Sequence, residues 1–175
     1  MRPTKLEMLA NLMTIVVSLL LSVVLVKVFL LPQPPASRAS AARPQAGRGT
    51  SLKGSLPGID WAKNKRTLVL ALSTQCHFCT DSAPFFQRIQ KETAKNVKML
   101  AVLPQAVGDA RKYLEQEGVH VDDVKQAQLS TIGVTGTPTL LLVDGTGKVA
   151  DVWPGKLQPE QEAGVLAVLK KGVLE

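Results

Sequence analysis

The order of the apolar segments after residue 51 limits the fold of this 175-residue chain more than any other feature of the sequence. Strand and helix patterns alternate along it: a strand at 66–73, a helix at 81–94, a strand at 97–103, a helix at 108–118, strands at 139–143 and 148–153, and a helix at 158–172. Strands joined through helices need crossovers and lie parallel, whereas the turn from Asp144 to Gly147 adds an antiparallel pair. We therefore expect an α/β domain over residues 51–175, with a mixed central sheet and helices on both faces.

An apolar run precedes this domain, from Leu9 to Leu31, and its only charge is Lys27. A helix of this length can cross a hydrocarbon core of about 30 Å, with Lys27 reaching the interface. The alternative is a cleaved signal peptide. The apolar core of a signal peptide is usually about 7 to 15 residues long, which is shorter than this run. The nearest small-residue cleavage site, Ala39 to Ala41, is also displaced from the run. The sequence predicts a short tail at 1–8 and a transmembrane signal-anchor helix at 9–31.

Residues 32–50 are rich in Pro, Ala, Ser, Gly and Arg and have no apolar periodicity, which is typical of a disordered linker. The formal net charge of the chain is +7, of which +5 falls in residues 1–50 and +2 in the domain. A nearly balanced domain with few aromatic residues argues against a nucleic-acid partner. The basic residues on the two sides of the apolar run do not decide its orientation in a membrane.

The only two cysteines of the chain, Cys76 and Cys79, stand in the stretch STQCHFCT, between the first predicted strand and the helix after it. Unpaired backbone N–H groups at the start of a helix favour a negative charge, such as a thiolate. The first cysteine of such a pair is exposed, and the second lies a turn further in and is protected. We expect Cys76 to attack a substrate disulfide and Cys79 to resolve the mixed disulfide.

Two other interpretations of the pair stay open. The first is an inert structural disulfide, although a two-residue loop stabilises little through chain entropy. The second is a zinc site, which would need further ligands, and His77 and His120 are the only histidines. We predict a redox couple with no metal and no cofactor.

The residues around the pair resemble the thioredoxin superfamily, and within it the membrane-anchored TlpA and ResA type of thiol-disulfide proteins. The resemblance covers about residues 56–172. It rests on the CxxC pair, on Pro84 five residues after the second cysteine, and on the segment IGVTGTPTLLLVDGTGKV. It implies a thioredoxin-like fold in which Pro84 kinks the active-site helix and Pro138 follows a cis peptide bond. It also implies that the Thr137 backbone binds an extended substrate and that Pro138 keeps metals away from Cys76.

The sequence departs from the family around the pair. The family often has tryptophan before the first cysteine, where Gln75 stands, and its buried acid, which accepts the proton of the inner thiol, falls on Leu70. Cys79 must then lose its proton to water, to His77 or to another acid, so we expect slow resolution or a partner-specific role. His77 directly follows Cys76, and as an imidazolium it would stabilise the thiolate and make the disulfide more oxidising.

These observations predict a membrane-tethered enzyme that exchanges disulfides with protein thiols on the extracytoplasmic (periplasmic) side of the cell membrane. It would reduce a substrate such as apocytochrome c or act in oxidative folding, with a membrane electron donor or acceptor as second partner. One alternative is a module that binds a partner or senses redox state with little turnover. Another is a peroxiredoxin-like thiol peroxidase, but Ser73 and Val69 stand where that family has threonine and proline.

Overall fold

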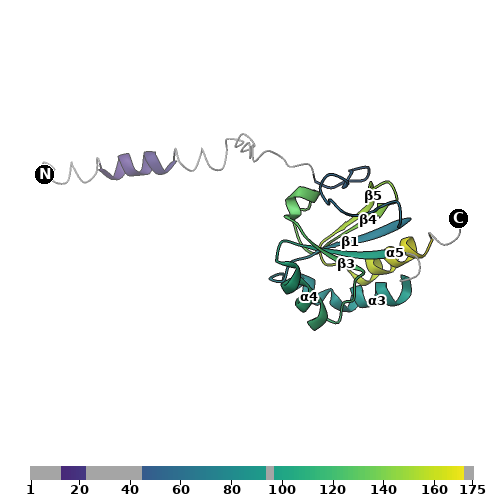
Figure 1. Cartoon of the computed structure of the whole chain (residues 1–175). Helices are drawn as coiled ribbons and strands as arrows, with labels where there is room; N and C mark the ends of the chain where they lie inside the picture. Colours follow the sequence, from purple (N-terminus) through teal and green to yellow (C-terminus); the bar gives the residue numbers. More distant parts are fainter. Residues whose placement is uncertain (1–12, 23–44, 94–96, 172–175) are drawn as a thin grey trace, which may run out of the picture. The chain divides into compact units, whose positions relative to one another are not determined.

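The computed structural model describes residues 13–22, 45–93 and 97–171. From residue 45 onward the described elements are β1 Arg66–Ala71, α2 His77–Asp81, α3 Ala83–Thr93, β2 Lys98–Leu103, α4 Val107–Gln116, β3 Asp123–Gln126, the 3-10 helix η1 Leu129–Ile132, β4 Thr139–Asp144, β5 Val149–Pro154 and α5 Pro159–Lys171. The strands form one sheet in the order β3-β2-β1-β4-β5 (Figure 1). The predicted α/β class with a mixed sheet is confirmed, and β3 and η1 are additions to the predicted elements.

Strand β1 lies at the centre of the sheet, parallel to β2 on one side and antiparallel to β4 on the other. Leu68 of β1 lies opposite Met99 of β2 and Leu142 of β4, and all three side chains belong to the same core. The strand is buried almost throughout, as expected for a continuous apolar run with neighbours on both edges. Its carboxyl end at Ala71 is therefore held firmly on both sides, and it leads into the cysteine pair.

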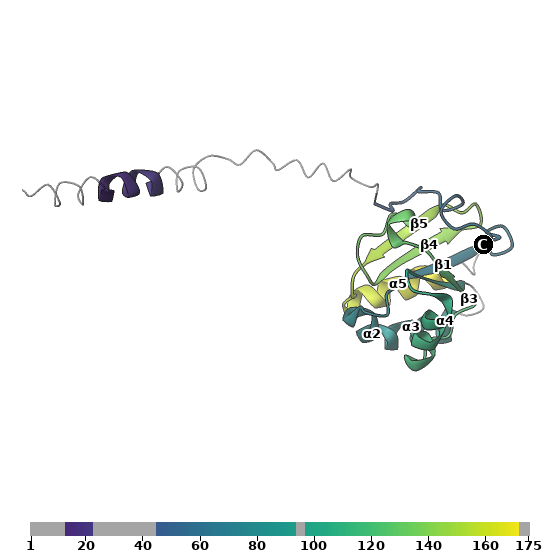
Figure 2. The same cartoon turned by 60° about the vertical axis from the view of Figure 1, so that its left-hand side comes forward.

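All four α-helices of the described domain pack on one face of this sheet. The connections from β1 to β2 and from β2 to β3 run in the same direction across the sheet. Right-handed crossovers that run in one direction place their helices, here α3 and α4, on the same face. Helix α5 packs against α3, and Figure 2 shows the four helices together on one side of the strands. The prediction that helices cover both faces of the sheet is therefore wrong for the α-helices, because all four lie on one face.

The other face of the sheet is covered by chain that contains no α-helix. Leu52, Leu56 and Trp61 from the segment before β1 pack there with Ile132 of η1 and with Val134. On the sheet side they meet the alternate residues of β1, β2 and β4. This second core needs no amphipathic helix because single large side chains from irregular backbone fill it.

The folded domain begins before the predicted boundary at residue 51. The Ala46 N–H donates to the carbonyl oxygen of Gly133 at 2.8 Å, and the Gly49 N–H donates to that of Val149 at 2.7 Å. Ala46 and Leu52 are buried in the second core. Residues 45–50, predicted as the end of the linker, thus pack on the domain, and residues 32–44 lie outside the described residues.

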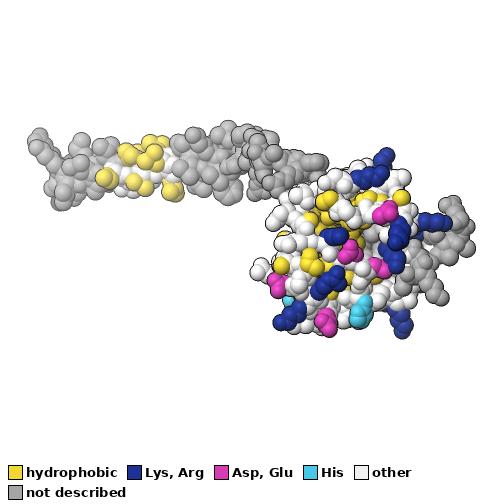
Figure 3. Space-filling view, in the orientation of Figure 1, with side chains coloured by type: hydrophobic (Ala, Val, Ile, Leu, Met, Phe, Trp, Pro, Cys, Tyr) yellow, Lys and Arg dark blue, Asp and Glu magenta, His cyan; other side chains and the backbone are white. Residues whose placement is uncertain are grey.

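Residues 13–22 form a helix with exposed apolar side chains (Figure 3). Among the described residues, no helix combines the length and the apolar character needed to span a membrane. The rest of the predicted signal anchor, 9–12 and 23–31, and the predicted tail at 1–8 lie outside the described residues.

Candidate active site

Cys76 lies at the junction between the central strand β1 and helix α2, where it is the N-cap residue of the helix. The N–H of Cys79 donates a hydrogen bond to Cys76 Sγ at 3.2 Å. The Cys76 thiol donates in turn to the carbonyl oxygen of Thr137 at 3.3 Å. Its side chain is partly exposed, so a partner can approach a sulfur that two contacts hold in place. The N–H bond also suits a thiolate, because a charged acceptor strengthens it.

Cys79 is the protected member of the pair, with a residue exposure of 1%. Burial raises the pKa of Cys79 from 9.0 to about 12, and the hydrogen bond with Cys76 and the negative charge of Cys76 raise it as well. The thiolate is the nucleophilic form of cysteine. Cys79 therefore reacts at neutral pH only after a neighbouring group or solvent has taken its proton.

The loop that leads into β4 places Thr137 against Cys76, 61 residues away in sequence. The peptide bond between Thr137 and Pro138 is cis, and Pro138 is buried. Thr139 Oγ1 donates to the carbonyl oxygen of Gly136 at 2.7 Å, and the Gly155 N–H donates to that of Pro138 at 2.7 Å. These bonds fix the loop on both sides, so a chain that reaches Cys76 also meets the backbone of Thr137.

A side-chain amide beyond the end of β2 holds the loop before Cys76. Gln105 Nε2 donates to Ser73 Oγ at 3.1 Å, and Gln105 Oε1 accepts the Thr74 N–H at 3.5 Å. The Cys76 N–H donates to the carbonyl oxygen of Ser73 at 3.1 Å. Gln105 thus fixes the backbone that positions Cys76.

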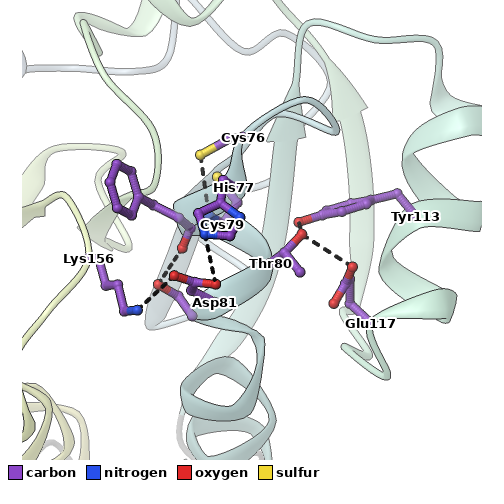
Figure 4. A network of polar contacts seen from close by, with 10 residues as sticks. Cys76, His77, Cys79, Thr80, Asp81, Tyr113, Glu117 and Lys156 are labelled. Carbon is purple, nitrogen blue, oxygen red and sulfur yellow. Dashed lines mark hydrogen bonds and ion pairs between the residues drawn. The ribbon is translucent and has the colours of Figure 1, made fainter.

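An ionic network lies along one side of α2 (Figure 4). His77 is exposed, and its Nε2 lies 3.5 Å from Asp81 Oδ1, one helical turn further on. Lys156, from the loop after β5, donates to Asp81 Oδ2 at 2.8 Å. This hydrogen bond holds the pKa of Asp81 below its usual range, and the charge of Lys156 and that of His77 when protonated act in the same direction. Asp81 therefore stays ionised at neutral pH beside the cysteine pair.

A second network lies on the other side of α2, where Thr80 contacts Tyr113 of α4 and Glu117, the C-cap residue of that helix (Figure 4). Thr80 Oγ1 lies 3.3 Å from Tyr113 Oη and donates to Glu117 Oε1 at 3.2 Å. Tyr113 packs against the core cluster that contains Cys79. Burial raises the pKa of Tyr113, and the negative charges of Cys79, Glu117 and Cys76 raise it as well. The Tyr113 hydroxyl therefore keeps its proton at neutral pH and lies within electrostatic reach of both thiols.

The remaining positions noted in the sequence lie around this centre. Leu70 is fully buried in the same core as Cys79, so β1 offers no carboxylate there. Pro84 is exposed at the start of α3, and the helix is interrupted at Ser82, two residues before it. Phe78, between the cysteines, is 56% exposed and presents an apolar ring to an approaching partner.

Sequence reasoning located the two thiols, His77, Thr137 and Pro138, and the structure brings them together. It missed the acids and the other side chains of the two networks: Thr80, Asp81, Tyr113, Glu117 and Lys156. For Asp81 a signal existed, because residues four apart on a helix are neighbours and Asp81 follows His77 at that spacing. For Lys156 no signal existed, since it comes from 75 residues further along the chain.

Within the described residues, no group of three or more His, Cys, Asp and Glu side chains could hold a metal ion. On the face of the domain shown in Figure 3, basic and acidic side chains are interspersed. The titratable side chains that the structure brings together at this centre are two thiols, one imidazole, the Tyr113 hydroxyl and the carboxylates of Asp81 and Glu117.

The sequence profile of the thioredoxin-like domain family matches residues 61–170. Comparison with curated proteins gives no match. A protein from Chlorobium tepidum named as the thiol:disulfide interchange protein DsbE is a similar solved structure, with 23% identity over 71% of this chain and 99% of its own, and a TM-score of 0.56. A thiol:disulfide interchange protein from a Bacteroides species has 20% identity over 75% of this chain and 91% of its own, with a TM-score of 0.54. The thioredoxin domain of a thiol-disulfide oxidoreductase from Bacteroides vulgatus has 20% identity over 70% and 91% of the two chains, with a TM-score of 0.52. At these identities the likeness is one of fold.

Proposed function

Because the chain belongs to the thioredoxin-like domain family, we propose that it is a thiol-disulfide oxidoreductase that exchanges disulfides with protein thiols through Cys76 and Cys79. The observation that carries this proposal is the pairing of a partly exposed, hydrogen-bonded Cys76 with a buried Cys79 one helical turn further in. An accessible sulfur that accepts a backbone N–H is suited to attack, and a protected thiol is suited to resolve.

The reaction has two exchange steps. The Cys76 thiolate attacks one sulfur of a substrate disulfide, a bond forms between Cys76 and that sulfur, and the other substrate sulfur leaves as a thiolate that takes a proton from solvent. Cys79 then loses its proton, attacks Cys76 Sγ and releases the second substrate thiol. The substrate gains two electrons and the pair becomes a disulfide; the reverse steps donate a disulfide.

The geometry around Cys76 favours an extended protein segment as substrate. The carbonyl oxygen of Thr137 faces Cys76 Sγ, so the backbone beside a substrate cysteine can pair with the Thr137 backbone. The exposed ring of Phe78 offers an apolar contact next to the reacting sulfur. Both contacts suit a polypeptide of varied sequence better than a small thiol.

The reduction potential of the pair tests this function and its direction. The protein is equilibrated in glutathione and in dithiothreitol buffers, with Cys76→Ser as control. A potential of about −270 mV or lower supports a reductase, and one towards about −120 mV supports a disulfide donor. A pair that stays unreactive in every buffer would remove the proposed function.

We further infer a membrane-anchored enzyme of the TlpA and ResA type with its domain on the extracytoplasmic side. The apolar run at 9–31 supports an anchor, the composition of 32–44 supports a tether, and thiol-disulfide exchange suits an oxidising compartment. A maleimide that cannot cross membranes should label Cys76 in intact cells, and alkaline carbonate should leave the protein in the membrane fraction. Labelling only after lysis would contradict the location, and release by carbonate would contradict the anchor.

A partner-binding role with little turnover is the second candidate, and the buried leucine at position 70 favours it, because resolution by Cys79 then lacks the family's carboxylate. The measurement that separates the two is binding of cellular partners to the Cys76→Ser protein. If the Cys76→Ser protein still binds the partners of wild type, the binding role is supported. If it no longer binds them, disulfide exchange is supported.

A further inference from the structure

The second exchange step needs the thiolate of Cys79, which the fold makes hard to form. Burial raises the pKa of this thiol to about 12, and Cys76 raises it as well. Among the described residues, the groups that hydrogen-bond the thiol are Cys76, Ser73 and Thr137, and none of them is a carboxylate. The bonds from the Ser73 backbone and the Thr137 side chain lower the pKa, so these two groups stabilise the thiolate.

Ser73 contacts both cysteines through its backbone. It lies just beyond the bond that the Leu72 N–H donates to the carbonyl oxygen of Val102 at 3.0 Å, and its own carbonyl oxygen accepts the Cys76 N–H at 3.1 Å. Its bond to Cys79 comes from the Ser73 N–H, because a carbonyl oxygen would accept the thiol proton and raise the pKa, whereas this bond lowers it. The position of the Ser73 backbone therefore decides how well a donor faces the buried sulfur.

Gln105 holds Ser73 from the end of the neighbouring strand. Its Nε2 donates to Ser73 Oγ at 3.1 Å, and its Oε1 accepts the Thr74 N–H at 3.5 Å. Ser73 Oγ also accepts the Gln75 N–H at 3.3 Å. Gln105 follows β2 by two residues, and β2 is buried between β1 and β3. One side-chain amide on a firmly held strand end thus fixes two successive residues of the loop before Cys76.

We propose that Gln105 is a positioning residue for the second exchange step, which it serves by holding the Ser73 N–H against the Cys79 sulfur. The inference rests on the proposed function and assigns a residue to one of its two steps. Cys79 loses its proton to solvent, and the Ser73 N–H stabilises the charge that the sulfur then carries. The thiolate attacks Cys76 Sγ, the bond between Cys76 and the substrate sulfur breaks, and the substrate leaves as a thiolate that takes a proton from solvent.

The first exchange step does not depend on this contact. Cys76 Sγ accepts the Cys79 N–H at 3.2 Å, and its thiol donates to the carbonyl oxygen of Thr137 at 3.3 Å. Neither contact passes through Ser73 or Gln105. Loss of the Gln105 amide should therefore slow the second step selectively, whereas a general loosening of the loop would slow both steps.

The two steps can be separated with the aromatic disulfide DTNB and the reduced full-length protein in detergent. Attack by Cys76 releases one coloured thiolate at a rate proportional to DTNB, and attack by Cys79 releases a second at a rate independent of DTNB. Gln105→Met keeps the length of the side chain and removes its amide. We expect its first phase to be unchanged and its second phase to be about fivefold slower at pH 7, which is the size of effect that one lost hydrogen bond produces.

Ser73→Ala removes the same contact from the other side and should slow the second phase as much as Gln105→Met does, and the double change should add no further loss. Ser73→Thr keeps the hydroxyl and should retain the wild-type rate. Gln87→Met removes a single amide hydrogen bond to the backbone at the end of α4, so it is the matched control and should leave both phases unchanged.

Two results would overturn the proposal: a second phase in Gln105→Met at the wild-type rate, or a first phase slowed as much as the second. Absence of the first phase in wild type would instead overturn the proposed function itself.

Discussion

The two cysteines lie three residues apart and occupy opposite environments. Cys76 is partly exposed and receives a hydrogen bond from the Cys79 N–H, whereas Cys79 is buried in the helix-covered core. Burial penalises the charged form of a thiol, and the nearby Cys76 charge adds to that penalty. In the proposed reaction, the order in which the two thiols react therefore follows from their depth in the fold and not from any difference between the side chains.

Because the pKa of Cys79 is raised in the folded protein, the stability of the reduced protein should decrease at alkaline pH. The unfolded thiol ionises near 9.0 and the folded one near 12, so the unfolded state loses the proton first. Stability is thus fully present below about pH 9 and falls by about 1.4 kcal/mol per pH unit above it. Between pH 7 and pH 10.5, we expect the free energy of unfolding of Cys79→Ala to fall by about 2 kcal/mol less than that of wild type. Urea unfolding of the two proteins at both pH values measures this difference. Equal losses in the two proteins would contradict the raised pKa.

Lys156→Met tests the ionic network at His77 and Asp81. Because the hydrogen bond from Lys156 is the main cause of the lowered Asp81 pKa, its removal should move that pKa up toward the ordinary value for aspartate. The measurement is a pH titration of the Asp81 carboxyl carbon by NMR. Lys91→Met, which removes an exposed lysine with no ion pair among the described residues, should leave the Asp81 titration unchanged.

At the scale of secondary structure, long apolar patterns could be predicted and short edge elements could not. The runs that became β1, β2 and β4 are continuous and apolar because both faces of those strands are buried. Strand β3 has four residues, of which only Val124 is buried, and it lies at the edge of the sheet, so its sequence shows no strand pattern. Because β3 was not predicted, the direction of the connection from β2 to β3 could not be predicted either. The face of the sheet on which α4 lies depends on that direction.

The same limit applies to the site. Short sequence patterns, the CxxC spacing and a Thr-Pro pair before an apolar strand, made it possible to predict Cys76, Cys79, Thr137 and Pro138. Gln105, Tyr113 and Lys156 could not, because each reaches the site from a strand end or helix whose place depends on the whole topology.

Helix α5 is attached to the central strand through Arg66. The guanidinium donates to the carbonyl oxygens of Leu169 at 3.2 Å and Val168 at 3.0 Å, which lie in the last turn of α5. Arg66→Met should reduce the free energy of unfolding by about 1 to 3 kcal/mol, measured by urea denaturation. Lys65→Met is the neighbouring control, since Lys65 is exposed, and it should change stability by less than about 0.5 kcal/mol. Equal effects of the two changes would remove this role of Arg66.

Across the whole domain, the two faces of the sheet are closed by different means. One face carries four α-helices around the cysteine pair, and the other is closed by the chain that enters the domain, together with η1. The entering segment also forms a bridge between Ser51 and Lys148, beside the hairpin of β4 and β5. The chain that precedes the first strand is therefore a structural part of the domain.

This arrangement predicts that a protein beginning at residue 45 is more stable than one beginning at residue 51. The shorter protein loses hydrogen bonds from the Ala46 and Gly49 N–H groups and one that the Val149 N–H donates to Thr50 O. At about 0.5 to 1.5 kcal/mol for each of these three bonds, we expect a loss of about 1.5 to 4.5 kcal/mol in urea unfolding. Arg48→Ala in the longer protein removes only the exposed ion pair with Asp151 and should cost less than about 1 kcal/mol. If the two lengths unfold at the same urea concentration, residues 45–50 contribute nothing to the fold and belong to the linker, as their composition alone suggests.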